Sequence, residues 1–247
     1  MKPRSEALLR LLAVQASWTY ERMAGIGVGH AAAPLLRDLF AGRSVRERRE
    51  AVARSADFFN CHPYLAGVAV GAVVKSERDG VPGATITRLR TALSGPLGAL
   101  GDQLIWAGWV PALIGAALVA VPWAGAWAVL VAVVVHNILR LRLTAWGLDL
   151  GLREGLDVGI ALQHSWLPRA AELAQRVAAF AVGAAMPVVA GSLLAGASRG
   201  VALMTVGVGI AGAAATVLPA TRTRVTGLRI GLGLMVVAVV LVVGAIA

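Results

Sequence analysis

The segment 94–106, Ser-Gly-Pro-Leu-Gly-Ala-Leu-Gly-Asp-Gln-Leu-Ile-Trp, stands directly before a long apolar run. Proline removes a backbone donor, and glycine weakens a helix. A bilayer tolerates interrupted backbone only where it is buried in protein or lines a watery cavity. We therefore expect a broken or re-entrant helix here, and we assign this structural role to Gly95, Pro96, Gly98 and Gly101.

The acid Asp102 follows the last of these glycines, with Gln103 beside it. A carboxylate at membrane depth is costly and marks a candidate functional site. Transporters hold polar solutes between half-helices near the midplane of the membrane, so both residues are candidate substrate contacts. Two alternatives remain open: Asp102 fits an N-cap of the next helix, and Gln103 fits a hydrogen bond between helices.

The composition is that of an integral membrane protein. Of the 247 residues, 58% are hydrophobic and 15% charged, and the mean hydropathy is +0.75. Soluble domains average roughly 45–50% apolar and 25% charged residues. The net charge of +10 lies in short polar stretches, as the positive-inside rule expects of cytoplasmic segments, and lacks the aromatic residues of nucleic-acid sites. The single cysteine, Cys61, excludes an intramolecular disulfide, and we expect no metal and no cofactor.

The N-terminal part predicts amphipathic and cytoplasmic helices. An apolar patch over residues 8–14 favours a helix that lies at the membrane interface. Residues 18–36 mix glycine with charged residues and predict a helix that buries those charges against protein. Ser44 and Glu47 match a capping box, which would start a helix running towards Phe58.

The next part predicts a half-span and a loop. Residues 65–74 are apolar, but they are only half of the roughly 20 residues that a span requires. Residues 75–90 are polar, with turn signals at Asp79-Gly80 and Pro82-Gly83, and predict a cytoplasmic loop.

The remaining sequence predicts membrane helices. The apolar run 104–139 favours two helices with a turn near Pro122. Glycines every four residues predict a ridge for close helix packing; they are Gly147, Gly151, Gly155 and Gly159. Three further spans are expected at 177–194, 201–218 and 228–247. The fold class is thus an all-α polytopic membrane protein, divided into regions 1–90, 91–160 and 161–247.

Three stretches together resemble the IID membrane component of mannose/fructose/sorbose-type sugar phosphotransferase systems. The stretch 15–23, Gln-Ala-Ser-Trp-Thr-Tyr-Glu-Arg-Met, is similar to Q-x-S-W-N-[YF]-E-R-M. The stretch 57–64, Asp-Phe-Phe-Asn-Cys-His-Pro-Tyr, is similar to E-F-F-N-T-[HQ]-P-[YF]. The stretch 95–102 is similar to G-P-L-A-G-[IV]-G-D, and Trp106 stands where a tryptophan follows. A weaker match begins at Asn137-Ile-Leu-Arg140.

This resemblance implies a bacterial plasma-membrane permease subunit that is not catalytic alone. Its implied partners are a IIC subunit, in a trimer of heterodimers, and soluble IIA and IIB components that carry the phosphate. Its implied function is to translocate a hexose or related sugar with IIC, by an elevator-type movement. The positive-inside rule places Arg176 and Arg224 in the cytoplasm, and with them the N-terminus, leaving the C-terminus outside.

Further candidate substrate contacts lie in the first two stretches. Glu21 offers a carboxylate for charge-assisted hydrogen bonds to hydroxyls, unless it pairs with an arginine. Asn60 offers donors and an acceptor, although it also fits the end of a helix. Trp18 offers a face for stacking on a sugar ring, and core or interface packing is the alternative. The four histidines show no shared metal spacing, and we expect none of them to carry phosphate.

The sequence departs from the family pattern at three positions. Thr19 replaces an asparagine, Cys61 replaces a threonine, and Val110 replaces the arginine before a proline. Each change removes or alters a polar side chain. The alternative to a sugar permease is therefore a diverged homologue with a role in assembly or regulation.

Overall fold

The computed structural model describes residues 2–42 and 44–196, together with the single positions 198, 200, 203 and 207. The chain forms two compact units, Met1–Ala185 and Met186–Ala247. In the described residues every element is a helix, and β pairing is limited to the isolated bridges Thr19–Met23 and Met23–Phe59. The all-α prediction is confirmed. Apart from the single positions 203 and 207, the expected spans 201–218 and 228–247 lie outside the described residues.

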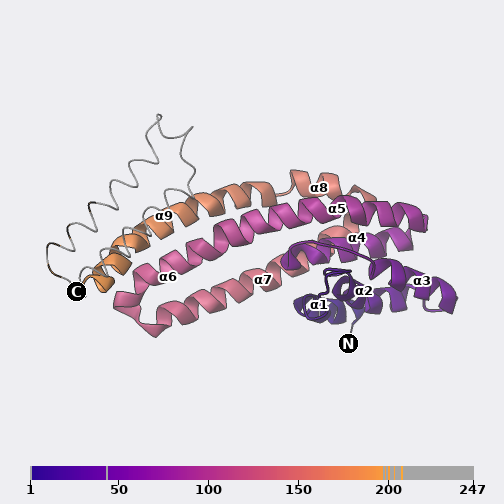
Figure 1. The fold of residues 1–247 in the computed structure, drawn as a ribbon. Helices are drawn as coiled ribbons and strands as arrows, with labels where there is room; N and C mark the ends of the chain where they lie inside the picture. The colour runs from indigo at the N-terminus through magenta and orange to yellow at the C-terminus, as the bar shows by residue number, and fades with distance from the viewer. Residues whose placement is uncertain are drawn as a thin grey trace. The chain divides into compact units, whose positions relative to one another are not determined.

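Twelve helical elements follow one another in the described chain (Figure 1). They are α1 (Pro3–Leu12), α2 (Gly25–Leu39), α3 (Val45–Ser55), η1 (Pro63–Leu65), α4 (Ala66–Arg78), α5 (Gly83–Leu104), η2 (Ile105–Trp109), α6 (Val110–Ala124), α7 (Ala126–Glu154), η3 (Gly155–Asp157), α8 (Val158–His164) and α9 (Leu167–Leu193). The elements η1 and η3 are 3₁₀ turns, whereas η2 is a π-helical turn.

The three N-terminal helices form a small layer at one end of the first unit. Helix α1 buries Ala7 and Leu11, which agrees with its predicted amphipathic character. Helix α3 begins where the capping box predicts, because the Ser44 side chain accepts a hydrogen bond from the Arg46 backbone N–H at 3.2 Å. It ends at Ser55, earlier than the predicted run towards Phe58.

The core of the first unit is the contact between α4 and α7. Along α4, every residue from 66 to 74 is buried, so this short helix is enclosed by protein. A Cβ added to Gly67 would lie 2.7 Å from the Thr144 carbonyl oxygen, and one on Gly71 would lie 2.6 Å from the Leu152 nitrogen. On α7, a Cβ at Gly151 would similarly lie 2.6 Å from the Ala72 nitrogen. The two backbones therefore touch through glycine, as close packing of membrane helices requires.

The predicted glycine ridge is confirmed in part. Gly147 and Gly151 lie in the contact with α4. Gly155 instead takes a positive φ of +56° at the end of α7, a conformation that favours glycine. Gly159 faces open space.

The expected cytoplasmic loop over 75–90 is mostly helical, so this prediction is wrong. Helix α4 continues to Arg78, and α5 begins at Gly83, which leaves a turn at the predicted glycine and proline signals. Ion pairs account for two of the polar residues in the last turn of α4, Lys75 and Glu77. Glu77 is buried and pairs with Arg54 of α3 at 2.8 Å, and Lys75 pairs with Asp79 at 2.6 Å.

The expected break at residues 95–101 is also wrong. Helix α5 runs without interruption from Gly83 to Leu104, with Pro96 inside it. Glycine and proline are tolerated in membrane helices because neighbouring groups satisfy the freed backbone. The irregular backbone comes later, at the π-helical turn η2, and such turns are frequent at functional sites. Asp102 lies within α5, so it is not the N-cap of a following helix.

Helices α6 and α7 form a long hairpin within the first unit (Figure 1). Its turn is at Gly125, three residues after Pro122, which confirms the predicted position. Trp123 and Trp127 flank the turn and are exposed, as expected of an aromatic belt at a membrane interface. Exposed apolar side chains continue along α7 from Val129 to Val135.

Two stretches of the described chain are long and apolar enough to cross a membrane, Gly83–Ala124 and Ala126–Ser192. Most of the side chains in their apolar windows are not buried within the protein. A large exposed apolar surface is stable in lipid and unfavourable in water. The chain is accordingly a membrane protein.

Candidate functional site

The first and second recognisable stretches are bonded to each other. The backbone of Met23 forms one bridge with Thr19 and another with Phe59. Phe59 donates its N–H to the Arg22 carbonyl at 3.3 Å and accepts from Ala24 at 3.0 Å. Met23 has a positive φ of 50°, uncommon for a residue other than glycine. The loop over residues 13–24 is therefore tightly anchored at its base.

The second and third stretches are joined by two contacts. The Ser94 hydroxyl donates to the Asn60 carbonyl at 2.5 Å and accepts from the Asn60 N–H at 3.2 Å. One turn before the end of α5, Gly101 faces His62, and a Cβ at position 101 would overlap Cβ and Cγ of the histidine. The glycine thus makes room for the His62 ring.

Arg90 of α5 fixes the chain that leads into this junction. Its guanidinium donates to the carbonyls of Arg54 and Ser55 at the end of α3, and to the Asp57 carbonyl at 3.0 Å. The same group lies 5.3 Å from the centre of the Phe59 ring. Because the last carbonyls of a helix lack partners within it, this buried cation caps α3.

His62 lies at the centre of the junction and is only 2% exposed. Its Nδ1 accepts a hydrogen bond from the Tyr64 backbone N–H at 3.2 Å. Burial lowers the pKa of His62 to about 4, although the nearby Asp102 charge acts in the opposite direction. The ring is therefore neutral at neutral pH. Among the described residues, no group is hydrogen-bonded to its buried Nε2.

An aromatic and basic cluster extends from His62 to α7. The Tyr64 ring lies edge-on to His62 at 4.9 Å between centroids, and the Tyr64 hydroxyl is 2.9 Å from Nε2 of His136. The guanidinium of Arg140 lies 5.4 Å from the centre of the Tyr64 ring and donates to the Leu12 carbonyl. On the other side, the Trp106 ring is 5.6 Å from His62.

A groove between α6 and α7 begins beside this cluster. Its volume is about 410 Å³, and apolar side chains line most of it. Trp106, His136 and Asn137 contribute to its lining. The groove is thus lined at this end by the Trp106 ring, the His136 imidazole and the Asn137 amide, and its volume is sufficient for a small ligand.

The structure brings some of the predicted site residues to this junction. Asn60 is held there by its backbone, with an exposed side chain. Asp102 follows Gly101 and acts on the charge of His62, and its side chain is exposed. Gln103 is its exposed neighbour on α5. No described residue is hydrogen-bonded to the Asp102 or Gln103 side chain.

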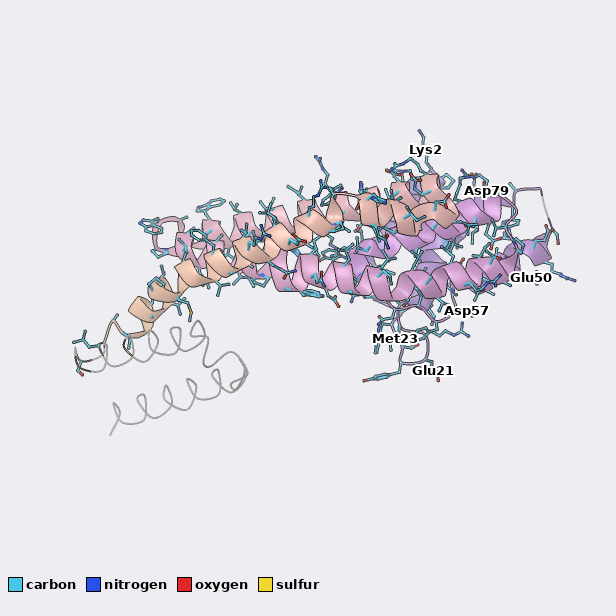
Figure 2. All side chains as sticks on the ribbon, turned by 90° about the horizontal axis from the view of Figure 1, so that it is seen from above. Lys2, Glu21, Met23, Glu50, Asp57 and Asp79 are labelled. Carbon is cyan, nitrogen blue, oxygen red and sulfur yellow. The ribbon has the colours of Figure 1, made fainter. Side chains whose placement is uncertain are left out.

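Two predicted residues lie on the projecting loop instead. Figure 2 shows Glu21 and Met23 on a loop that extends away from the helices, with Asp57 near its base. Glu21 is exposed and forms no ion pair with a described residue. Trp18 is partly exposed and contacts Tyr20 edge-on at 5.0 Å. The predicted charge burial in residues 18–36 is therefore wrong at Glu21, because the helix begins only at Gly25.

The four structural positions on α5 serve different purposes. Gly95 and Gly98 face open space, and Pro96 borders a groove towards α8. Gly101 alone of these glycines is required by a close contact, the one with His62.

Sequence reasoning missed Tyr64, His136 and Arg140 as parts of the cluster and gave His62 no role. The sequence did contain a signal for His62 and Tyr64, because both belong to the second recognisable stretch. The weak match at residues 137–140 pointed to the same part of α7. Their proximity was not visible, since Tyr64 and His136 are 72 positions apart.

The exposed side chains at the junction can donate and accept hydrogen bonds and offer an aromatic face. Asp102 is an acceptor, Asn60 is both donor and acceptor, and Trp106 offers an aromatic face. In residues 2–42 and 44–196, no three His, Cys, Asp or Glu side chains are grouped so that they could hold a metal ion. Cys61 is buried beside His62 in the sequence, and burial raises the pKa of its thiol to about 12.

Comparison with known proteins identifies related chains. The family model "PTS system mannose/fructose/sorbose family IID component" matches residues 1–194. The mannose-specific EIID component of Escherichia coli strain K12 is 28% identical over 182 residues, which are 71% of this chain and 64% of that one. The fructose permease IID component of Bacillus subtilis is 26% identical over 180 residues, 68% of this chain and 62% of that one.

Solved structures are similar as well. A chain of the mannose transporter ManYZ in complex with microcin E492 has a TM-score of 0.55 and 26% identity, over 74% of this chain and 68% of that one. A chain described as a membrane protein has a TM-score of 0.62 at the same identity and coverage. The present chain thus spans less than two thirds of the length of the curated relatives that it matches.

Proposed function

Because the chain belongs to the mannose/fructose/sorbose family of phosphotransferase-system IID components, we propose that it is a subunit of a sugar permease. In this proposal it translocates a hexose or related sugar together with a IIC subunit. The supporting observation is the junction of the second and third recognisable stretches at His62 and Gly101, beside a groove of about 410 Å³, with the first stretch bonded to the second at Phe59. Related chains are named for mannose, fructose and sorbose.

The proposed substrate contacts lie in two places, at the junction and on the loop over 13–24. Asn60, Asp102 and Gln103 lie at the junction and expose polar side chains that remain available for a hydroxyl. Trp18 and Glu21 lie on the loop over 13–24, whose base is bonded to the second stretch. We propose that this loop contributes to the sugar site when the IIC subunit is in place.

The chain is proposed to be non-catalytic by itself. In the proposed complex, residues 1–247 act as one permease subunit, IIA and IIB carry the phosphate, and IIC completes the path for the sugar. This division of labour accords with the burial of His62, since a phosphate acceptor needs an exposed nitrogen. Incubation with phosphorylated IIB should leave this chain unlabelled.

The proposed location is the bacterial plasma membrane. The N-terminal helices and their arginines lie in the cytoplasm, as the positive-inside rule requires. The tip of the α6–α7 hairpin, with Trp123 and Trp127, lies on the outer side. The C-terminus also lies outside, and the subunit pairs with IIC, in a trimer of such pairs.

Uptake of labelled sugars tests this function. Cells that lack their own mannose-type permease would express this chain with its neighbouring IIC and IIAB, and uptake of D-mannose, D-fructose and L-sorbose would be measured. The variant Asp102→Asn should lower uptake of the transported sugar by at least about tenfold, because it removes a charged acceptor. The matched control is Asp157→Asn, which changes an exposed acid remote in sequence from the junction. Assembly with IIC must be equal in all variants.

Failure would take two distinct forms. If wild type takes up none of the three sugars, the permease function is wrong for hexoses of this family. If wild type and Asp102→Asn transport equally, the solute is held elsewhere and Asp102 has no substrate role.

A further inference from the structure

A second groove of the first unit lies between α1 and α7, towards the end of α7 that is remote from the hairpin tip. Its volume is about 420 Å³. Apolar side chains form most of its walls, among them Leu9, Leu12, Leu141 and Ala145. Leu9 and Leu141 are each more than half exposed, so the groove is open to its surroundings. In a membrane, such a groove takes up an acyl chain or a protein segment, and the polar groups at its end favour one of the two.

Helix α1 runs in the opposite direction to α7 along this groove. Near the start of α1, the Arg4 guanidinium donates two hydrogen bonds to the Asp149 carboxylate, at 2.9 and 2.8 Å. At the end of α1, the Leu12 carbonyl accepts a hydrogen bond from Arg140. One end of the groove is therefore polar, at Arg4 and Asp149, and the other end lies among leucines.

The depth of the groove in a bilayer follows from its position along α7. Trp127 is exposed at the hairpin tip, where it fits an aromatic belt at one membrane interface. At a rise of about 1.5 Å per residue, Leu141 lies about 21 Å and Asp149 about 33 Å along the helix from Trp127. The hydrocarbon core of a bilayer is about 30 Å thick. The leucine end of the groove thus lies within the hydrocarbon, and the polar end lies at the headgroups of the leaflet remote from the tip.

Cations and available hydroxyl groups gather towards the polar end. Lys2 is exposed, and Figure 2 shows its side chain projecting away from the helices. Arg142 is exposed one turn before Ala145, and neither basic group forms an ion pair with a described residue. Ser5 and Thr144 line the groove, and no described residue is hydrogen-bonded to either hydroxyl, although Thr144 is only 3% exposed. Long basic side chains extend along apolar surface and place their charge at the headgroups.

We propose that this groove binds one anionic phospholipid. An acyl chain lies against the leucines, and the hydroxyls of Ser5 and Thr144 donate to the ester oxygens. The ammonium of Lys2 and the guanidinium of Arg142 bind the headgroup phosphate. An anionic headgroup fits better than a zwitterionic one, because the carboxylate at this end of the groove, that of Asp149, is already bound by an arginine. In the proposed topology the lipid belongs to the cytoplasmic leaflet, whose anionic lipids attract basic segments.

The experiment measures lipid binding by native mass spectrometry. The full chain is co-expressed with its IIC subunit, purified in detergent and titrated with dioleoyl phosphatidylglycerol or dioleoyl phosphatidylcholine, which have the same acyl chains and differ in net charge. We expect one phosphatidylglycerol to bind at least about tenfold more tightly than phosphatidylcholine. Arg142→Gln should weaken phosphatidylglycerol binding by about fivefold, the effect of one basic residue near an anionic lipid. The matched control is Arg169→Gln, an exposed arginine on α9 that lies outside the groove, which should change binding less than twofold.

A second variant tests the apolar part of the groove. Ala145→Phe fills the space of the acyl chain and leaves the basic residues in place, so it should weaken the binding of both lipids by at least about tenfold. The control is Ala126→Phe, which changes an exposed alanine at the hairpin tip. Gel filtration establishes that both variants are folded.

Several results would overturn the lipid site. Equal affinity of the wild type for the two lipids would contradict an anionic ligand, and equal losses in Arg142→Gln and Arg169→Gln would indicate general charge attraction without a site. If a folded Ala145→Phe chain no longer co-purifies with IIC, the groove holds a segment of that subunit instead. The inference goes beyond the proposed transport function, because a chain that binds the lipid at this groove and takes up no sugar would leave it standing.

Discussion

Arg90 is the residue on which the geometry of the junction depends most. Its guanidinium caps the end of α3 and lies over the Phe59 ring. It also binds the Asp57 carbonyl, and so fixes the chain that leads to Asn60 and His62. The sequence did not predict this capping role, because Arg90 lies at the end of a polar stretch that was predicted to be a loop. The partners are backbone carbonyls about 35 positions away, and no pattern of residue types marks a carbonyl.

Replacement of Arg90 by methionine should destabilise the protein. The change leaves three carbonyls without their donor, and hydrogen bonds to a charged group contribute about 1.5–3 kcal/mol each, so the unfolding free energy should fall by about 3 kcal/mol or more. The matched control is Arg88→Met on the same helix, where the arginine is exposed and donates a hydrogen bond to the Thr85 hydroxyl. Unfolding by sodium dodecyl sulfate in detergent micelles would measure both. Equal stability of the two variants would contradict the capping role.

Helix α5 shows how far a local pattern can mislead. Glycine and proline predicted an interruption at residues 95–101, yet the helix is continuous there and becomes irregular only at η2. The pattern correctly marked Gly101 as a position that requires glycine, but it wrongly attributed this requirement to a break in the helix. Gly101 is needed for contact with a side chain, and this requirement cannot be distinguished from a backbone requirement in the sequence.

Two alanine substitutions one turn apart on α5 test this view. Gly98 faces open space in a continuous helix, so Gly98→Ala should raise the unfolding free energy by up to about 1 kcal/mol. Gly101→Ala should lower it, because the new methyl group displaces His62. Chemical unfolding of the purified protein checks both. Destabilisation by Gly98→Ala would indicate that the helix is interrupted after all.

The contact of α4 with α7 was predicted better. The four-residue spacing of glycines on α7 indicated a ridge, and hydropathy identified α4 as too short to span a membrane. The partner of the ridge was not predictable, because Gly67 and Gly71 were visible only as part of an apolar run. Two glycine pairs facing each other explain how so short a helix is completely buried.

A bulky residue in this contact should prevent assembly of the fold. Gly71→Val places two methyl groups where the α7 backbone lies, so we expect loss of folded protein after purification in mild detergent. Gly159→Val is the matched control, since its glycine faces open space, and it should purify normally. Gel filtration compares the two. A monodisperse Gly71→Val protein would contradict the close packing of α4 and α7.

At the scale of the molecule, the proposed topology places the hairpin tip outside the cell. The single native cysteine, Cys61, is buried and contributes little background in a labelling experiment. In intact cells, Trp123→Cys should react with a membrane-impermeant maleimide, because its side chain is 79% exposed at the tip. Arg48→Cys on α3 should react only after lysis. The reverse result would invert the orientation of the subunit.

Composition and hydropathy predicted an all-α membrane protein, and the three recognisable stretches identified its family. The bonding of the second stretch to the other two was beyond the sequence, because it depends on contacts of residues 59–62 with the loop over 13–24 and with α5, which are distant in the chain. This arrangement is the observation on which the proposed sugar site rests.

The most direct test of this account is the melting temperature of the purified complex with IIC, measured with and without hexose. Only a protein that binds the sugar is stabilised by it, by about 2.7 kcal/mol at a hundredfold excess over Kd. We predict a saturable increase with D-mannose, D-fructose or L-sorbose, absent with glycerol at the same concentration and reduced in Asp102→Asn. A wild-type complex whose melting temperature is unchanged by all three sugars would contradict the central claim.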